Sequence, residues 1–182
     1  MCLVMAIKTR SAIIEGAFDL LSRRPTSTLA EIADHAGVGR ATLHRHYPSR
    51  EALMKALAQQ AIAEVSAAIE EKTAKATSHA EGLRLALEAM VPLGARQGFL
   101  AHEPVERDPE IATLMQRDMD ALRAEIEAAR AEGLFAPDVP TEWIAQSYSA
   151  LVYAAWTMVQ EGEATPRQAS DLAWRTLTKG LE

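Results

Sequence analysis

The stretch from residue 28 to residue 53 constrains the fold of this 182-residue chain more than any other segment. It reads TLAEIADHAGVGRATLHRHYPSREAL. Thr28, followed three residues later by Glu31, is a capping box, which starts a helix because each side chain bonds a free amide near the other. Gly37 stands where a chain leaving a short helix needs a left-handed residue. A second short helix is expected from Arg40 to about Tyr47, so the stretch is a predicted helix-turn-helix.

The second of these helices is unusually rich in side chains that donate hydrogen bonds. Such a density of donors has no use in a protein core, but it suits the base edges and phosphates of a DNA major groove. Ala41 is small, which permits the helix to approach the DNA closely. The exposed face of this helix is predicted to comprise Arg40, Ala41, Thr42, His44, Arg45 and His46.

On these residues the stretch resembles the TetR family of bacterial repressors. The matching features are Ala36-Gly37-Val38 at the turn, Thr42-Leu43 in the second helix and Tyr47-Pro48-Ser49-Arg50-Glu51 after it. Gly39 stands where the family usually has a serine cap, so a side-chain acceptor is lost. His44 stands where the family usually has a phosphate-binding tyrosine, and an imidazole N–H can also donate to a phosphate.

The resemblance implies roles for individual residues in binding operator DNA. Phosphate contacts are expected from Thr28, His44 and Arg50, with Tyr47 as a further candidate and Lys8 and Arg10 in reach of flanking phosphates. Base contacts are expected from Arg40, Thr42, Arg45 and His46. The alternative, a helical hairpin with a solvated basic face, is less consistent with the spacing and the glycine placement.

The distribution of charge supports a polyanion partner for one end of the chain only. The net charge is −6, yet residues 1–55 contain eight Lys and Arg against five Asp and Glu, while residues 56–182 contain eleven against twenty. A basic head on an acidic body indicates that the head alone meets nucleic acid.

The remainder of the sequence predicts further helices and no strand. Ala, Leu, Glu and Arg dominate, and β-branched and aromatic residues are sparse. We expect an all-α protein with a helix-turn-helix domain at 1–54 and a helical domain for effector binding and dimerisation at 55–182, joined within a long helix. From capping signals and breakers, helices are predicted at about 9–22, 49–77, 78–93, 108–132, 140–162 and from 165 onward, with mixed structure over 94–104.

Two segments near the C-terminus predict a dimer interface. The helix over 140–162 is apolar nearly all round, which is typical of burial on several sides, and the last helix adds a second apolar stripe. They either form a four-helix interface with a twofold mate or cover the core of the monomer. The predicted interface residues are Leu151, Val152, Ala155, Val159, Leu172 and Leu177.

The middle helices are expected to surround a cavity for a small apolar or amphipathic effector. Methionine and aromatic side chains make adaptable pocket walls, although each of them alone is more often ordinary core. The candidate pocket residues are Met90, Phe99, His102, Met115, Met119, Trp143, Tyr148 and Trp156.

The sequence offers no signature of catalysis. Nucleophile elbows, phosphate-binding loops and dinucleotide motifs are absent, and the motif that begins at His102 lacks the second histidine of a zinc site. We expect no enzyme activity, no catalytic or metal-binding residues and no cofactor. The single cysteine, Cys2, and the lack of a signal peptide or a membrane span in the sequence predict a cytoplasmic protein.

The predicted function is that of a dimeric transcriptional regulator, a repressor, that binds a palindromic operator and is released by a small apolar or amphipathic ligand. The alternative is a helical ligand-binding or enzymatic protein whose head docks a protein partner. Binding to random DNA at low and moderate salt separates the two, because only a DNA-binding head has phosphate affinity.

Overall fold

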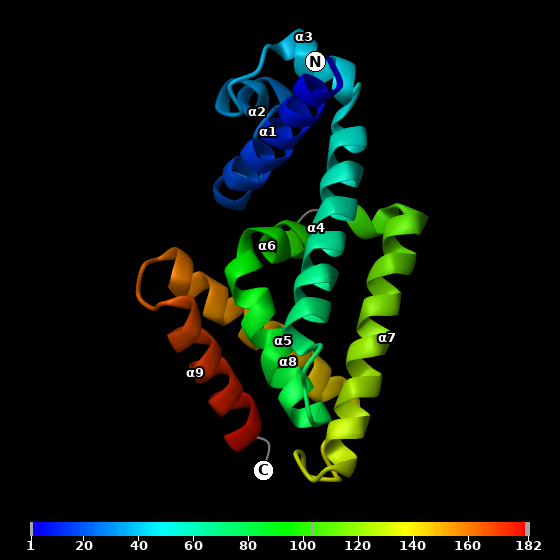
Figure 1. Cartoon of the computed structure of the whole chain (residues 1–182), viewed down its shortest axis with the longest axis vertical. Coiled ribbons are helices and arrows are strands. Elements are labelled where there is room, and N and C mark those ends of the chain that lie inside the picture. The colour runs from blue at the N-terminus through cyan, green and yellow to red at the C-terminus, as the bar shows by residue number, and fades with distance from the viewer. Residues whose placement is uncertain (1, 103, 181–182) are drawn as a thin grey trace.

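The computed structural model describes the backbone of residues 2–102 and 104–180, with side chains described there except at 2–7, 97, 101 and 102. These residues form helices joined by short turns, with no strand (Figure 1). The all-α prediction is confirmed. The head consists of α1 (Cys2–Arg23), α2 (Leu29–His35) and α3 (Arg40–His46).

The long helix α4 (Arg50–Thr73) leaves the head and continues through the body (Figure 1). The remaining helices form the body. These are α5 (His79–Met90), the short 3-10 turn η1 (Val91–Leu93), α6 (Gly94–His102), the 3-10 turn η2 (Val105–Arg107), α7 (Pro109–Ala131), α8 (Thr141–Gln160) and α9 (Pro166–Lys179).

Side-chain caps start most of these helices at the predicted positions. In α2, α4, α5, α7 and α9, the hydroxyl or carboxylate of the N-cap residue accepts a hydrogen bond from a backbone N–H of the first turn. These bonds satisfy donors that have no partner within the helix. Gly37 has a φ of +67° and turns the chain between α2 and α3, as predicted. The caps are Thr28, Ser49, Ser78, Asp108 and Thr165.

The structure differs from three predictions for individual segments. Helix α1 begins at Cys2 instead of near residue 9, because the residues before Thr9 include good helix formers and no breaker. Helix α4 ends at Thr73, four residues earlier than expected. Residues 94–102 form the helix α6 despite Gly94 and Gly98, which lie on one face of that helix, four residues apart.

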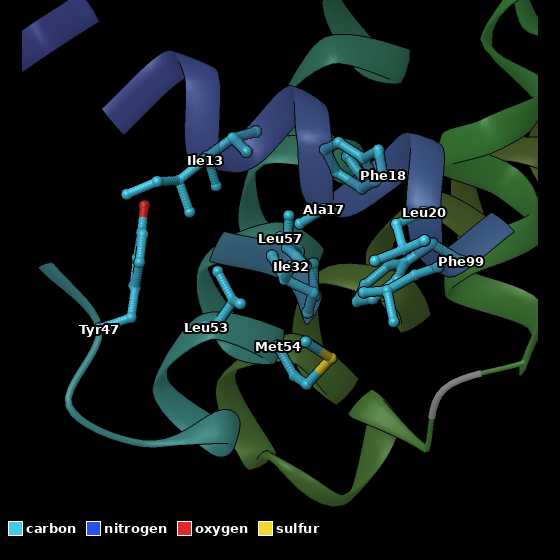
Figure 2. Packing of buried hydrophobic residues seen from close by; sticks show 14 of the residues in the cluster. Ile13, Ala17, Phe18, Leu20, Ile32, Tyr47, Leu53, Met54, Leu57 and Phe99 are labelled. Atoms are coloured by element: carbon cyan, nitrogen blue, oxygen red, sulfur yellow. The ribbon is translucent and has the colours of Figure 1, made fainter. Parts of the chain in front are cut away.

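The buried side chains form two hydrophobic clusters, and the upper one crosses from head to body. It combines residues of α1, α2, α3 and α4 with Phe99 of α6, Val105 of η2 and Ile111 of α7. Figure 2 shows Phe99 beside Phe18 and Leu20 of α1, and the Phe18 and Phe99 ring centroids are 5.6 Å apart in an edge-to-face arrangement. The lower cluster lies among α5, α7, α8 and α9. The predicted domain boundary at residue 54 stays a prediction, since the head core continues along α4 beyond it.

Candidate nucleic-acid interface

Helix α3 is held from within by two side chains and turns its polar side chains outward. Leu43 and Tyr47 are buried in the head core. Because a helix buries one stripe, the residues between them face away from the core. Arg40, Ala41, His44 and Arg45 are exposed, and Thr42 and His46 are half-buried.

The start of α2 is fixed by the predicted capping box. The Thr28 backbone N–H and hydroxyl donate to Glu31 Oε2 at 2.8 and 2.9 Å, and the Glu31 amide donates to Thr28 Oγ1 at 3.3 Å. These bonds, first from the Thr28 backbone and then from its hydroxyl, lower the pKa of the Glu31 carboxyl. Arg24 adds an ion pair with Glu31 at 2.6 Å. Thr28 itself is exposed, directly before α2.

Two other predicted DNA-binding residues are engaged inside the head. Tyr47 is only 5% exposed, and its hydroxyl accepts a hydrogen bond from Arg10 Nε at 3.2 Å. Arg50 donates to the carbonyl oxygens of Ser27 at 2.5 Å and Pro25 at 3.1 Å, which ties the start of α4 to the loop before α2. Both residues therefore set the position of the surface that the exposed donors form.

A shallow apolar notch lies between the first turns of α2 and α3. Its walls are Leu29 and Ala30 of α2 and Ala41 and Leu43 of α3. Arg40 and His44 stand at its edge. The exposed face of α3 thus combines charged donors with a small apolar recess.

The residues that build this head are those that define a known family. A family model of bacterial regulatory proteins, the tetR family, matches residues 13–57. The HTH-type transcriptional repressor LfrR of Mycolicibacterium smegmatis is 34% identical over 176 residues, which cover 96% of this chain and 90% of the relative. The chain belongs to the TetR family.

Solved structures extend the likeness of this TetR-family regulator to its whole fold. A structure of LfrR from Mycobacterium smegmatis in complex with proflavine has a TM-score of 0.79 at 31% identity, covering 96% of both chains. AibR, solved in complex with isovaleryl coenzyme A and operator DNA, has a TM-score of 0.78 at 20% identity, covering 93% of this chain and 98% of that one. The second likeness shows the fold alone.

The structure disperses most of the side chains predicted to line an effector pocket of this TetR-family protein. Tyr148 is buried, and its hydroxyl donates to the Leu83 carbonyl at 2.8 Å; burial raises the pKa of this phenol. Met90 and Met119 pack against the lower hydrophobic cluster, and Met115 packs against the upper one. Trp143 is 60% exposed at the start of α8. The side chain of His102 lies outside the described residues.

Phe99 and Trp156 are the two members of the predicted pocket that line a common cleft. This cleft, of about 160 Å³, lies where the end of α1 and the following loop meet α6 and α8. The Trp156 indole rests on the backbone of α6, where a Cβ built on Gly98 would lie 2.7 Å from its Cη2 atom. The spacing of Gly94 and Gly98 was the sequence signal for this close approach.

The predicted interface residues divide between the core and the surface. Val152, Ala155 and Leu177 are buried within the lower hydrophobic cluster, and Val159 packs against it. Leu151 is half-buried and Leu172 is exposed. The exposed side of α8 instead carries a large aromatic and two small side chains at a spacing of seven and four residues, namely Trp143, Ala150 and Ala154.

Charged side chains that the sequence reasoning did not select join the head to the body. Arg96 of α6 donates through Nη2 to both carboxylate oxygens of Glu15 on α1, at 2.7 and 2.9 Å, and through Nε to Glu64 of α4 at 2.7 Å. Its side chain is only 16% exposed, and its guanidinium carbon lies 4.5 Å from the centre of the Phe18 ring.

A second charged cluster joins the first turns of α4 to the start of α7. Lys55 forms ion pairs with Asp108 at 3.0 Å and with Glu110 at 2.8 Å. Nothing in the spacing of these residues along the chain brings them together, so only the fold reveals the contact.

In the described part of the chain, no helix is both long and apolar enough to cross a membrane. Among the same residues, no three or more His, Cys, Asp or Glu side chains gather as a metal site would require.

Proposed function

We propose that this TetR-family regulator is a repressor that binds a palindromic operator as a dimer and leaves it when a small apolar or amphipathic ligand binds. The observation that carries the proposal is the face of α3. Its donors point outward, while Leu43, Tyr47, Arg10 and Arg50 fix the helix from behind. A rigid helix that presents such a face is what reading a major groove requires.

The side chains of α3 suit separate tasks in reading DNA. Arg40 and Arg45 carry guanidinium groups that can pair with the two acceptors on a guanine edge. The notch beside Ala41 is apolar and suits the methyl group of a thymine. His44 is exposed next to the notch and is placed for a phosphate or a base acceptor.

The exposed side of α8 is the proposed dimer interface. Trp143, Ala150 and Ala154 recur at a spacing that places them on one face of the helix. Small residues there permit close packing of two helices, and the exposed Trp143 supplies apolar area for burial. Exposed Leu172 of α9 adds to the surface. Two heads related by a twofold axis then meet two half-sites of the operator.

The dimer interface is testable by charge insertion. Ala154→Arg places a charge in a contact from which water is excluded, and it should convert a dimer into a monomer in sedimentation experiments. Ser149→Arg is the matched control, because Ser149 is exposed on the same helix but on another face. A wild-type protein that sediments as a monomer at micromolar concentration contradicts the proposal.

Release by a ligand requires that the body control the orientation of the head. The contacts that can carry this control are the shared core around Phe99, the ion pairs of Arg96 and the ion pairs of Lys55. All three connect α6 or α7 to α1 or α4. A ligand that favours a different arrangement of the body therefore changes the spacing of the two α3 helices, and it shifts the equilibrium only by its difference in affinity for the two arrangements.

The decisive experiment identifies the operator and then asks what releases it. Genomic footprinting supplies bound sequences, and fluorescence anisotropy measures affinity for one of them with and without a ligand. Proflavine is the first probe, since the relative LfrR has been solved with it. Enriched palindromic sites and a lower affinity in the presence of the probe support the proposal. Binding that shows no preference among sequences contradicts it.

A further inference from the structure

The cleft at the junction of head and body has walls from both. Leu21, Ser22 and Pro25 come from the end of α1 and the loop after it. Gly98 and Phe99 come from α6. Helix α8 completes it with Tyr153, Trp156, Thr157 and Gln160. A molecule in this cleft would touch the two units whose relative position decides whether the heads fit an operator.

The size and the walls of the cleft suit one aromatic ring. Its volume is about 160 Å³, and apolar cavities of about 150 Å³ in proteins bind benzene. The rings of Tyr153 and Trp156 lie with their centroids 5.3 Å apart at a tilt of 58°. A further ring placed against such a pair gains edge or offset-stacked contacts.

Two hydroxyls of the cleft, those of Ser22 and Thr157, can accept a hydrogen bond from a group on the ring. The Ser22 hydroxyl donates to the Asp19 carbonyl and the Thr157 hydroxyl donates to the Tyr153 carbonyl, both at 3.0 Å. With their hydrogens committed, both oxygens retain lone pairs and act as acceptors. They suit a ligand with an O–H or N–H donor on its ring.

Hydrogen bonds and an ion pair connect the head side of the cleft to the part of the head that is proposed to bind DNA. The Pro25 carbonyl accepts from Arg50 at the start of α4. The neighbouring Arg24 pairs with Glu31, which belongs to the capping box that starts α2. A displacement of the loop after α1 therefore alters contacts with the first turns of α2 and α4.

We propose that this cleft binds a single-ring aromatic molecule bearing one hydrogen-bond donor, such as a phenol, and that occupancy separates head from body and weakens operator binding. The proposal rests on the proposed function, for which it supplies a site and a ligand class.

The test uses 4-fluorophenol with the full-length protein. Binding is followed by fluorine NMR of the probe, and operator affinity by anisotropy of labelled DNA. We expect saturable binding and at least about a fivefold loss of operator affinity at saturation, the lower end of ordinary allosteric coupling. Absence of saturable binding overturns the proposal. Binding without any change in operator affinity also overturns it.

A pair of variants locates the site. Thr157→Phe places a ring in the cleft, so it should abolish binding of the probe. Its operator affinity without any probe should equal the reduced affinity of the wild type saturated with probe. Thr113→Phe is the matched control, because Thr113 is exposed on α7 and its hydroxyl bonds the Pro109 carbonyl four residues back, as that of Thr157 bonds the Tyr153 carbonyl. Probe binding that survives Thr157→Phe overturns the assignment.

Two controls keep folding and the wider function apart from this result. Ser22→Phe fills the cleft from the head side, so it gives a second reading if Thr157→Phe lowers the melting temperature. Operator binding by the wild type without any probe tests the DNA-binding function by itself. Specific operator binding together with indifference to 4-fluorophenol would leave the proposed function intact and remove only the ligand site.

Discussion

Trp156 of α8 lies so close to Gly94 of α6 that a Cβ atom on the glycine would overlap the Cδ1 atom of the indole. The two helices therefore meet at backbone distance, with the ring laid across Gly94 and Gly98. Trp156 is only 9% exposed, and its ring lies against both glycines of α6. Because α6 also carries Phe99 and Arg96, its position against α8 fixes both links to the head.

The contact predicts an unusual response to alanine. Gly→Ala inside a helix ordinarily stabilises a protein by about 0.5–1 kcal/mol, but Gly94→Ala must displace the indole and should destabilise by about 1–3 kcal/mol, as overpacked cores do. Urea unfolding measures the difference. Gly82→Ala in α5 is the control, because its Cβ would meet only the end of the Glu125 side chain, which can move. Equal effects of the two substitutions would contradict the close contact.

Arg96 is expected to stabilise the junction between head and body. Arg96→Met removes the cationic partner of Glu64 in a partly buried site and leaves that carboxylate only the hydrogen bond from Gln60 Nε2. The loss of these charged hydrogen bonds should cost about 1–3 kcal/mol of unfolding free energy. The share from Glu15 is small, since that side chain is half exposed. Arg117→Met, which removes an exposed pair with Asp118 at 3.1 Å, should change stability little. Matching losses in both variants would refute the special role of the junction.

Alanine substitutions of Arg45 and Arg50 should differ in their effects on melting temperature and on operator affinity. Arg45 is exposed on α3, so Arg45→Ala should leave the melting temperature unchanged and cost about 1–3 kcal/mol at one operator position. Arg50→Ala breaks bonds to the Pro25 and Ser27 carbonyls and should lower the melting temperature and the affinity for every sequence together. A panel of operator variants and a thermal melt on the same samples separate the two. Stability unaffected by Arg50→Ala would show that its contacts with the loop are dispensable.

The notch beside Ala41 predicts a dependence on thymine methyl groups. Replacing one thymine of the operator by uracil removes only a methyl, so the affinity should fall at the positions that face the notch. Ala41→Ser makes the recess polar and should reduce that difference between thymine and uracil. Anisotropy with singly substituted operators measures it. A uniform response at all thymine positions would argue against a methyl contact.

The sequence was sufficient for the head because its signals are local. The Thr28–Glu31 capping box and the left-handed Gly37 each depend on a few neighbouring residues, and the structure contains both. Helix α6 was missed because its glycines were interpreted as breaks, although they serve a contact with Trp156, which lies 62 residues beyond Gly94. Local propensity does not register such a contact.

The apolar residues of α8 show a second limit of the sequence. Its apolar residues predict burial on several sides, but periodicity does not tell which side meets the core and which side stays open. Val152 and Ala155 proved to be core, whereas Trp143 is exposed. Ion pairs such as Arg96 with Glu15 were equally out of reach, because 81 residues separate the partners.

The final prediction concerns acid, through the cluster of Lys55, Asp108 and Glu110. The hydrogen bond from Lys55 is the largest cause that lowers the pKa of both carboxyls, and the bond to Glu110, followed by the bond to Asp108, raises the pKa of Lys55. A carboxyl whose pKa is lowered by folding adds stability above its unfolded pKa, about 4, and that stability is lost as the pH falls through the folded value. Lys55 has the opposite sign, since its contribution is present below an unfolded pKa of about 10.4 and is lost as the pH rises through the folded value.

Asp108→Asn retains an acceptor for the first turn of α7 but removes the charge, so the free energy of unfolding should fall less steeply between about pH 5 and 3 than in the wild type. Urea titrations at constant ionic strength measure both slopes, with Glu161→Gln at the end of α8 as the control. An unchanged acid slope in Asp108→Asn would mean that the ion pair adds nothing to the attachment of α7 to α4.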